Sequence, residues 1–370
     1  MLNLQSKMDL NCFKQTYQDA RLAFKHALKL IDPELIFESQ SFQHPLTDSD
    51  AKNLFCDAVF LSQSAKPKHV LVLICGTHGI EGFTGSAVQI DTLPLLADLL
   101  KQQADLGVVL IHALNPWGFA WLRRSDHQGI DLNRNFIDFS QPLPSNPDYQ
   151  TLHTQLQGLT ADSDLTCLWE NTDFNTFVAK ITQGQYQQAD GLFYGGTQAS
   201  WSQQQLNKIA QHAFIQNAEQ LSVIDVHTGL GPYGYGEIIN DHTPNTAGFA
   251  WAETLYGNNA CSALLGESCS APKLGLLDYF WHDLMGGRGC FITLEYGTFA
   301  VQHLILELLK EQLYQNQLKA DQQRDLQAKP VVDLKNFFYP FEPSWQQQVL
   351  FRARQTIAMA LTGMLKGLSQ

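Results

Sequence analysis

The sequence predicts an α/β protein in which a mixed, mostly parallel central sheet is flanked by helices. Two observations lead to this prediction. Continuous apolar runs of strand length occur, such as HVLVLIC at residues 69–75, and runs of this kind are typical of strands covered on both faces. A segment with helical character at 86–103 separates this run from a second one at 107–116, and strand–helix–strand order is the signature of parallel strand pairing.

The remaining segments extend this pattern over the whole chain. Apolar residues recur every three or four positions over 13–31, which predicts a helix. Pro94 is expected to bend or divide the helix at 86–103. We expect a single domain over residues 1–370 with a largely helical, Gln-rich insertion at about 145–220. Further strands are predicted at 54–62, 221–227 and 289–297, further helices at 163–183, 200–219, 300–318 and 346–367, and a long loop at 115–147.

Composition limits the classes of function that the chain can have. The 370 residues are 44% hydrophobic, which suffices for a sizeable core, and the net charge of −12 argues against nucleic acid as a partner. No run of about 18 apolar residues exists, so no membrane span is expected. The N-terminal segment has Asp and Gln where a signal peptide would need an unbroken apolar core, so no signal peptide is expected either. Seven cysteines, odd in number and without CxxC spacing, indicate reduced thiols and a cytoplasmic location.

Four short polar motifs stand at or just beyond the ends of predicted strands: GTHGIEG, GIDLNRNF, DVHTGLG and TLEYGTF. In an open α/β sheet, ligands bind outside the carboxyl ends of the strands. The four motifs are therefore expected to converge at one edge of the sheet and to form a site there.

The first and third motifs predict a metal site. His78 and Glu81 lie three residues apart in a glycine-rich turn, and His227 ends an apolar strand. Two His nitrogens, one Glu oxygen and a water are a ligand set of catalytic zinc sites, so one Zn²⁺ per chain is predicted. Asp225 is placed to orient His227, and the glycines of GTHGIEG are expected to leave room for the metal and a water. A lone strand-end histidine is more often a hydrogen-bonded structural residue than a ligand, and it is the combination with the other motifs that favours the metal.

A second metal stays open at this stage. The unassigned candidates for it are His112, His127 and His242, of which His112 closes the strand nearest the predicted site.

The fourth motif ends a predicted strand with Glu295, a carboxylate that must be paired, metal-bound or used as a base. Metal-assisted hydrolysis requires a base beside the water, and we assign that role to Glu295. The alternative is a salt bridge to a loop arginine.

The second motif supplies groups that bind anions. The planar guanidinium of Arg134, next to Asn133, suits a substrate with a free carboxylate. An arginine beside the metal can polarise a carbonyl, and Arg123 and Arg124 are both candidates. Asp131 is expected to brace the loop that carries these residues.

The order of the motifs along the chain resembles that of the zinc carboxypeptidases of the carboxypeptidase A superfamily. HxxE, then Asn-Arg, then a strand-end His, then a strand-end Glu occur in both. The resemblance implies the fold of that superfamily and a hydrolase. It also implies zinc binding by His78, Glu81 and His227, a grip on the substrate carboxylate by Asn133 and Arg134, and general-base catalysis by Glu295.

CGTHGIEG and NPWGFA…RR…DLNRNF resemble more closely the aspartoacylase and succinylglutamate desuccinylase branch, which hydrolyses N-acyl amino acids. The upstream arginine of that branch corresponds to Arg123 or Arg124, and the spacing leaves both open. DVHTGLGP resembles a bacterial metallopeptidase-like group. The peptidases bring a tyrosine to the substrate from a mobile loop, for which Tyr233, Tyr235 and Tyr256 are candidates.

The expected function is a metallocarboxypeptidase that releases a C-terminal amino acid. The alternative is a deacylase of small N-acyl amino acids, which would use the same metal and arginines. A binding protein without turnover on the same fold is the third possibility. In the first two cases the partner is a small substrate, a peptide or an N-acyl amino acid, with a free carboxylate.

Overall fold

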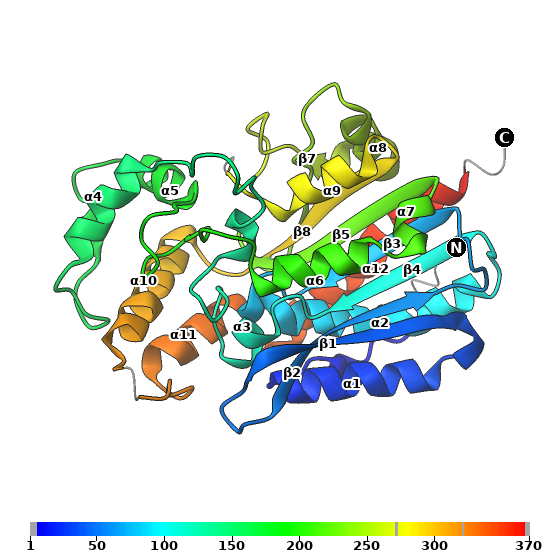
Figure 1. The fold of residues 1–370 in the computed structure, drawn as a ribbon, viewed down its shortest axis with the longest axis horizontal. Coiled ribbons are helices and arrows are strands. Elements are labelled where there is room, and N and C mark those ends of the chain that lie inside the picture. The colour runs from blue at the N-terminus through cyan, green and yellow to red at the C-terminus, as the bar shows by residue number, and fades with distance from the viewer. Residues whose placement is uncertain (1–5, 271–272, 320–321, 367–370) are drawn as a thin grey trace.

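A computed structural model describes residues 6–270, 273–319 and 322–366 and contains one eight-stranded sheet (Figure 1). The strand order is β1-β2-β4-β3-β5-β8-β6-β7. Four neighbouring pairs, including the central β4-β3-β5-β8 run, are parallel and three are antiparallel, which confirms the predicted mixed sheet. The strands are β1 (Ile36–Thr47), β2 (Asn53–Leu61), β3 (His69–Cys75), β4 (Leu106–His112), β5 (Gln220–Gly229), β6 (Gly236–Ile239), β7 (Ala260–Cys261) and β8 (Gly289–Gly297).

The apolar runs form central strands because both faces of the sheet are covered. Every residue of β3 and β4 is buried. Successive side chains of a strand point to opposite faces, so Leu71 and Leu73 of β3 join one core cluster while Val72 and Ile74 join the other. The first cluster includes side chains of α1 (Tyr17–Leu30), α2 (Gly82–Leu100) and α12 (Pro343–Lys366), and the second includes side chains of α6 (Trp201–Ala210), α7 (Ala213–Asn217) and α9 (Leu277–Met285).

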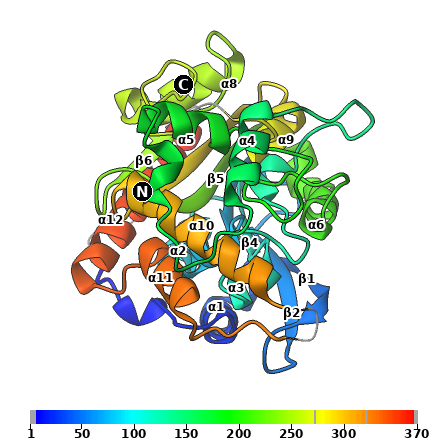
Figure 2. The same ribbon diagram turned by 90° about the vertical axis from the view of Figure 1, so that its left-hand side faces the viewer.

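Several helices gather beyond the carboxyl ends of β5 and β8, at the left of Figure 1 and facing the viewer in Figure 2. Two of them lie within the segment expected as a helical insertion, whose status as an insertion in a single domain stays a prediction. The helices at this end are α4 (Pro147–Leu156), α5 (Phe174–Thr182), α10 (Val301–Gln317) and α11 (Lys329–Phe338). Helix α8 (Ala247–Tyr256) contacts β8 and α12.

Three details differ from the sequence-based expectations. Pro94 lies inside α2, which continues through it as one helix, so the proline does not divide the helix. The segment expected as a loop at 115–147 contains the short helix α3 (Pro116–Ala120) and a 3₁₀ turn, Leu132–Arg134. Strand β1 was not predicted, because its residues alternate between half-buried and exposed and carry Pro45, and so form no apolar run.

Candidate active site

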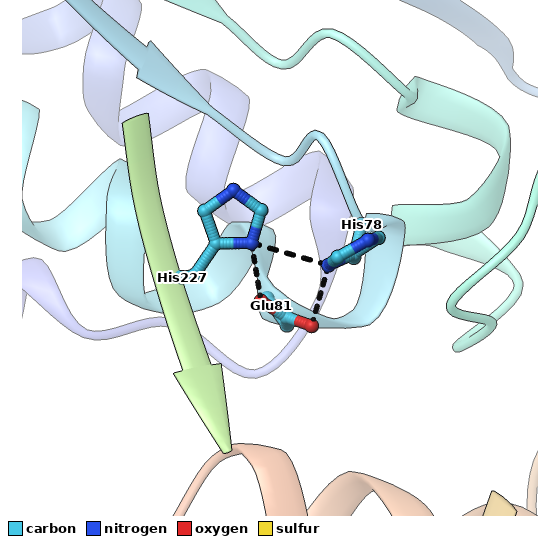
Figure 3. A group of neighbouring side chains, drawn as sticks. All are labelled: His78, Glu81 and His227. Atoms are coloured by element: carbon cyan, nitrogen blue, oxygen red, sulfur yellow. Dashed lines mark hydrogen bonds and ion pairs between the residues drawn. The ribbon is translucent and has the colours of Figure 1, made fainter. Parts of the chain in front are cut away.

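Three side chains that follow or end two neighbouring parallel strands converge on one point (Figure 3). His78 and Glu81 lie on the turn after β3, and His227 lies near the end of β5. Nδ1 of His78 is 2.9 Å from Oε1 of Glu81. Nδ1 of His227 is 3.1 Å from Nδ1 of His78 and 3.2 Å from Oε2 of Glu81. All three side chains are buried, so the structure brings together the predicted ligand set.

The arrangement of these donor atoms fits a zinc ion. Two imidazole nitrogens 3.1 Å apart repel each other unless one carries a proton or a cation lies between them. Tetrahedral ligands at zinc–ligand distances of about 2.0–2.1 Å lie about 3.3 Å from one another, close to the three separations seen here. Within the described ranges, no other group of three or more His, Cys, Asp or Glu side chains could hold a metal.

Each histidine is oriented by a carboxylate at its other ring nitrogen. Nε2 of His227 lies 2.7 Å from Asp225, which also accepts a hydrogen bond from the Thr77 hydroxyl at 2.8 Å. Nε2 of His78 lies 3.1 Å from Oδ1 of Asp131. Such partners fix the ring orientation and direct the free Nδ1 atoms to the metal position. The contact of Asp225 was expected, whereas Asp131, expected only to brace its loop, also positions a ligand.

Asp131 is therefore expected to affect metal binding without touching the metal. Asp131→Asn should weaken zinc affinity by about 10–100-fold, measured by competition with a chromogenic chelator. Asp138→Asn, an exposed change in the same segment, is the matched control and should leave the affinity unchanged. Equal affinities of the two variants would contradict the positioning role.

The glycines of the first motif serve packing instead of clearing space for the metal. A Cβ added at Gly79 would lie 2.1 Å from the backbone of Gly118, and one at Gly82 would lie 2.5 Å from the ring of Phe119. Neither glycine lines the cavity described below. The expectation that they leave room for metal and water was wrong, because the turn after β3 packs directly on α3 and only glycine permits that approach.

Glu295 lies on β8 opposite His227 of β5 in the strand register. Its Oε1 accepts a hydrogen bond from the backbone N–H of Leu230 at 3.0 Å. No arginine pairs with it within the described part of the chain, so the salt-bridge alternative finds no support. Burial, followed by the negative charge of Glu81, raises the pKa of Glu295 to about 7. A carboxyl group with this pKa can exchange protons near neutral pH.

The structure separates the two candidate arginines. The turn after β3 holds their backbone, because the N–H groups of Gly79 and Ile80 donate to the carbonyls of Arg124 and Arg123. The Arg124 side chain lines the cavity, with Nη1 3.3 Å from Glu81 and Nε 3.0 Å from Asp131. The Arg123 side chain points elsewhere, with Nε 3.0 Å from Glu311 of α10. Arg123 is not among the residues that line the cavity.

The Asn-Arg pair lies at the cavity wall and is fixed by neighbouring elements. Oδ1 of Asn133 accepts a hydrogen bond from the backbone N–H of Leu277, at the start of α9, at 2.8 Å. The Arg134 guanidinium is buried and donates to the carbonyl oxygen of Thr182 at the end of α5. Both residues line the cavity. The ring of Phe193 lies 5.5 Å from the Arg134 guanidinium carbon and 5.8 Å from that of Arg124, and so connects the two arginines.

A cavity of about 560 Å³ is lined by the three candidate metal ligands and by Glu295, Arg124, Asn133 and Arg134. Sequence reasoning missed a set of charged residues on its wall, the buried Asp278 and the half-buried Asp241 and Lys273. Oδ1 of Asp278 is buried and has no hydrogen-bond partner in the described structure. Burial raises the pKa of Asp278 and lowers that of Lys273 to about 8. The sequence offers no strand-end motif at these positions, since they come from the segment after β6 and the region where α9 begins.

The unassigned histidines and tyrosines have other surroundings. His112 stacks on Phe24 and its Nε2 lies 2.8 Å from the hydroxyl of Ser86. His127 contacts His44, and His242 stacks on His282. Tyr233, Tyr235 and Tyr256 are absent from the cavity lining.

Comparison with solved structures identifies the fold. Carboxypeptidase A from Helicoverpa armigera matches with a TM-score of 0.51 at 12% identity over 100% of this chain and 79% of that chain. Bovine thrombin-activatable fibrinolysis inhibitor, solved with tick carboxypeptidase inhibitor, matches with a TM-score of 0.50 at 13% identity over 95% and 98% of the two chains. The chain therefore has the fold of these two carboxypeptidase-like structures, which agrees with the fold that the motif order implied.

The chain belongs to the family described as a protein of unknown function (DUF2817), whose model matches residues 13–352. No curated protein sequence matches it. Among the helices of the described residues, none is long and apolar enough to cross a membrane.

Proposed function

We propose that this protein is a zinc-dependent hydrolase that cleaves an amide bond next to a free carboxylate, acting as a metallocarboxypeptidase that releases a C-terminal amino acid. The observation that carries the proposal is the convergence of His78, Glu81 and His227 beside the buried Glu295, in a cavity that Arg134 also lines. Zinc, when bound by the first three residues, supplies Lewis-acid chemistry that polarises a carbonyl and acidifies water.

The other residues perform binding and proton transfer. Arg134, with Asn133 beside it, holds the substrate carboxylate and thereby fixes the position of the scissile amide. Arg124 donates hydrogen bonds to the carbonyl oxygen as negative charge develops on it. Glu295 keeps Oε1 on the Leu230 N–H, and its Oε2 takes a proton from the attacking water and passes it to the leaving amine.

A deacylase of N-acyl amino acids is the second candidate, with the same residues in the same roles. The mostly apolar wall that α5 and α10 give the cavity beyond Glu295 favours it, since an acyl group needs apolar surface and few hydrogen bonds. In both candidates the bond cleaved is an amide whose leaving amine carries the carboxylate.

The proposal is tested with pairs of substrates that differ only in whether the terminal carboxylate is free or is converted to an amide. Zinc-loaded protein is incubated with a pool of peptides and N-acyl amino acids, each present as the free acid and as the C-terminal amide, and products are identified by mass spectrometry. Only the free acids should be cleaved. Arg134→Gln should lower kcat/KM for the acids by about 10–100-fold, because a hydrogen bond to a charged group contributes about 1.5–3 kcal/mol. Equal cleavage of acids and amides would contradict the carboxylate requirement.

The pH dependence should follow Glu295. A general base acts only when deprotonated, so kcat/KM is expected to fall as the pH falls through the pKa of Glu295, which is about 7 without metal. A bound cation opposes the charge of Glu81 and lowers this pKa. The acid limb of the profile should therefore have its midpoint between the ordinary value of 4.5 and about 7. A midpoint above 7, or a limb unchanged in Glu295→Asp, would contradict the assignment.

A further inference from the structure

The cavity extends in two directions from Glu295. Phe291, Thr293 and Glu295 alternate along β8, share one face of the strand and all line the cavity. Phe299 and Ala300, which follow β8, and one face of α10 from Val301 to Leu308 line it as well. One part of the cavity therefore runs back along β8, and the other runs forward along α10, with the candidate metal ligands between them.

The part that runs back along β8 is charged and lies next to the carboxylate-binding pair. Its wall includes Asp241, Lys273 and Asp278. The Asn133 side chain is bonded to the start of α9, one residue before Asp278. The backbone of the segment after Lys273 packs on Arg134, since a Cβ at Gly275 would lie 2.3 Å from the Arg134 carbonyl oxygen. The substrate carboxylate and the amino acid that bears it therefore belong at this charged end.

The part that runs forward along α10 is apolar. Its lining residues on α10 follow the spacing of a single helix face. Helix α5 contributes two small or apolar side chains and two uncharged polar ones, Asn175 and Thr182. Neither α10 nor α5 contributes a charged side chain to the lining, and the helix face covers about 10 Å at 1.5 Å per residue. The small or apolar lining residues are Val301, Leu304, Ile305 and Leu308 of α10, and Val178 and Ala179 of α5.

The same stripe of α10 continues one turn beyond Leu308, and there it is fixed by buried ion pairs. Glu311 lies 3.0 Å from Nε of Arg123 and 2.7 Å from Nη1 of Arg324. Gln312 accepts a hydrogen bond from Arg123 at 2.8 Å. The apolar face of α10 is thus held toward the cavity by a charged network that does not itself enter the cavity.

From this asymmetry we infer that the carbonyl side of the substrate amide carries a large hydrocarbon group, which binds between the apolar faces of α10 and α5. The inference rests on the proposed function, since the carboxylate at Arg134 sets which way the amide lies. A fatty-acyl chain and the apolar side chain of a peptide residue share this chemistry, and burial of either stabilises the bound state by removing hydrocarbon from water.

Acyl chain length is the variable that tests the inference. Nα-acetyl-, butanoyl-, hexanoyl- and octanoyl-lysine are given to zinc-loaded protein, and kcat/KM is measured for each. The amino acid is kept constant so that only the acyl chain varies. Each added methylene should raise kcat/KM by up to about fourfold until the apolar part is filled. Acetyl-Gly-Lys and acetyl-Leu-Lys, compared in parallel, distinguish a peptide side chain from an acyl chain as the source of the hydrocarbon.

A charge placed on the apolar face should remove the length dependence. Val301→Asp puts a carboxylate into this part of the cavity at the first turn of α10, where a helix tolerates acidic residues. The ratio of kcat/KM for octanoyl- over acetyl-lysine should fall by at least about tenfold, since burying an unpaired charge is costly. Gln302→Asp, the same change at the adjacent exposed position outside the cavity, should leave the ratio as in the native protein.

Measurements of substrate binding distinguish a failure of this inference from a failure of the proposed function. Calorimetry on zinc-loaded Glu295→Gln should show the dissociation constant falling with chain length. Tighter binding of longer chains without hydrolysis by the native protein would overturn the proposed function and retain the inference. Hydrolysis of all four compounds at one rate, or a ratio unaffected by Val301→Asp, would overturn the inference.

Discussion

Glu295→Gln is expected to lower kcat by about 10²–10⁴-fold while zinc remains bound. Glutamine retains the shape of the side chain and can still accept the Leu230 N–H, but it cannot take a proton from water. The measurement combines turnover on a cleaved substrate with the zinc content of the dialysed protein. Glu237→Gln is the matched control, because Glu237 is the strand partner of Glu295 on β6, is buried and does not line the cavity.

The same substitution should not destabilise the metal-free protein. The folded-state pKa of Glu295, about 7, lies above its ordinary value of 4.5. Ionisation therefore opposes folding, and the stability that the protonated carboxyl provides is lost as the pH rises through 7. Above pH 7, metal-free Glu295→Gln should melt at a temperature no lower than the native protein. Full turnover by this variant, or a loss of its zinc, would refute the general-base role.

Arg124→Ala is expected to lower kcat by about 10²–10³-fold, the usual effect of removing one donor to a developing oxyanion. The Arg124 side chain lines the cavity and lies 3.3 Å from Glu81, within reach of a carbonyl at the metal position. Steady-state kinetics on a substrate cleaved by the native protein measures the effect. Most of it should fall on kcat, because the interaction strengthens only as charge develops.

Arg123→Ala is the matched comparison at the adjacent residue. Arg123 pairs with Glu311, and both side chains are buried outside the cavity. Breaking a buried ion pair costs about 3–5 kcal/mol of stability, and Arg324 keeps part of the pairing of Glu311. The variant should melt earlier, with kcat per zinc-loaded folded molecule close to the native value. The reverse outcome, with kcat lost in Arg123→Ala and retained in Arg124→Ala, would contradict the assignment.

The sequence was sufficient to predict the central strands and the residues that meet at their ends. Strands β3, β4, β5 and β8 are buried on both faces, which requires the apolar runs that predicted them. His78, Glu81 and His227 stand at the ends of these runs, so the parallel order of the strands brings them together. Their convergence therefore follows from features that can be read along the chain.

Other parts of the site depend on contacts that no local pattern encodes. Arg123 and Arg124 are adjacent in one loop, and only the packing of that loop on the turn after β3 directs one side chain into the cavity and the other to α10. Asp278 and Asp241 reach the cavity through the placement of α9 and of the segment after β6. The glycines of the first motif were assigned to the metal because the sequence does not show that α3 packs against them.

We propose that one zinc ion, held by His78, Glu81 and His227, drives amide hydrolysis in this cavity. Titration of zinc into metal-free protein, with product release from a free-acid substrate as the readout, tests it most directly. Activity should rise linearly to one equivalent of zinc per chain and then stay constant, and Glu81→Ala should show no such rise. Full activity before any metal is added, or a linear rise that ends at two equivalents, would contradict the proposal.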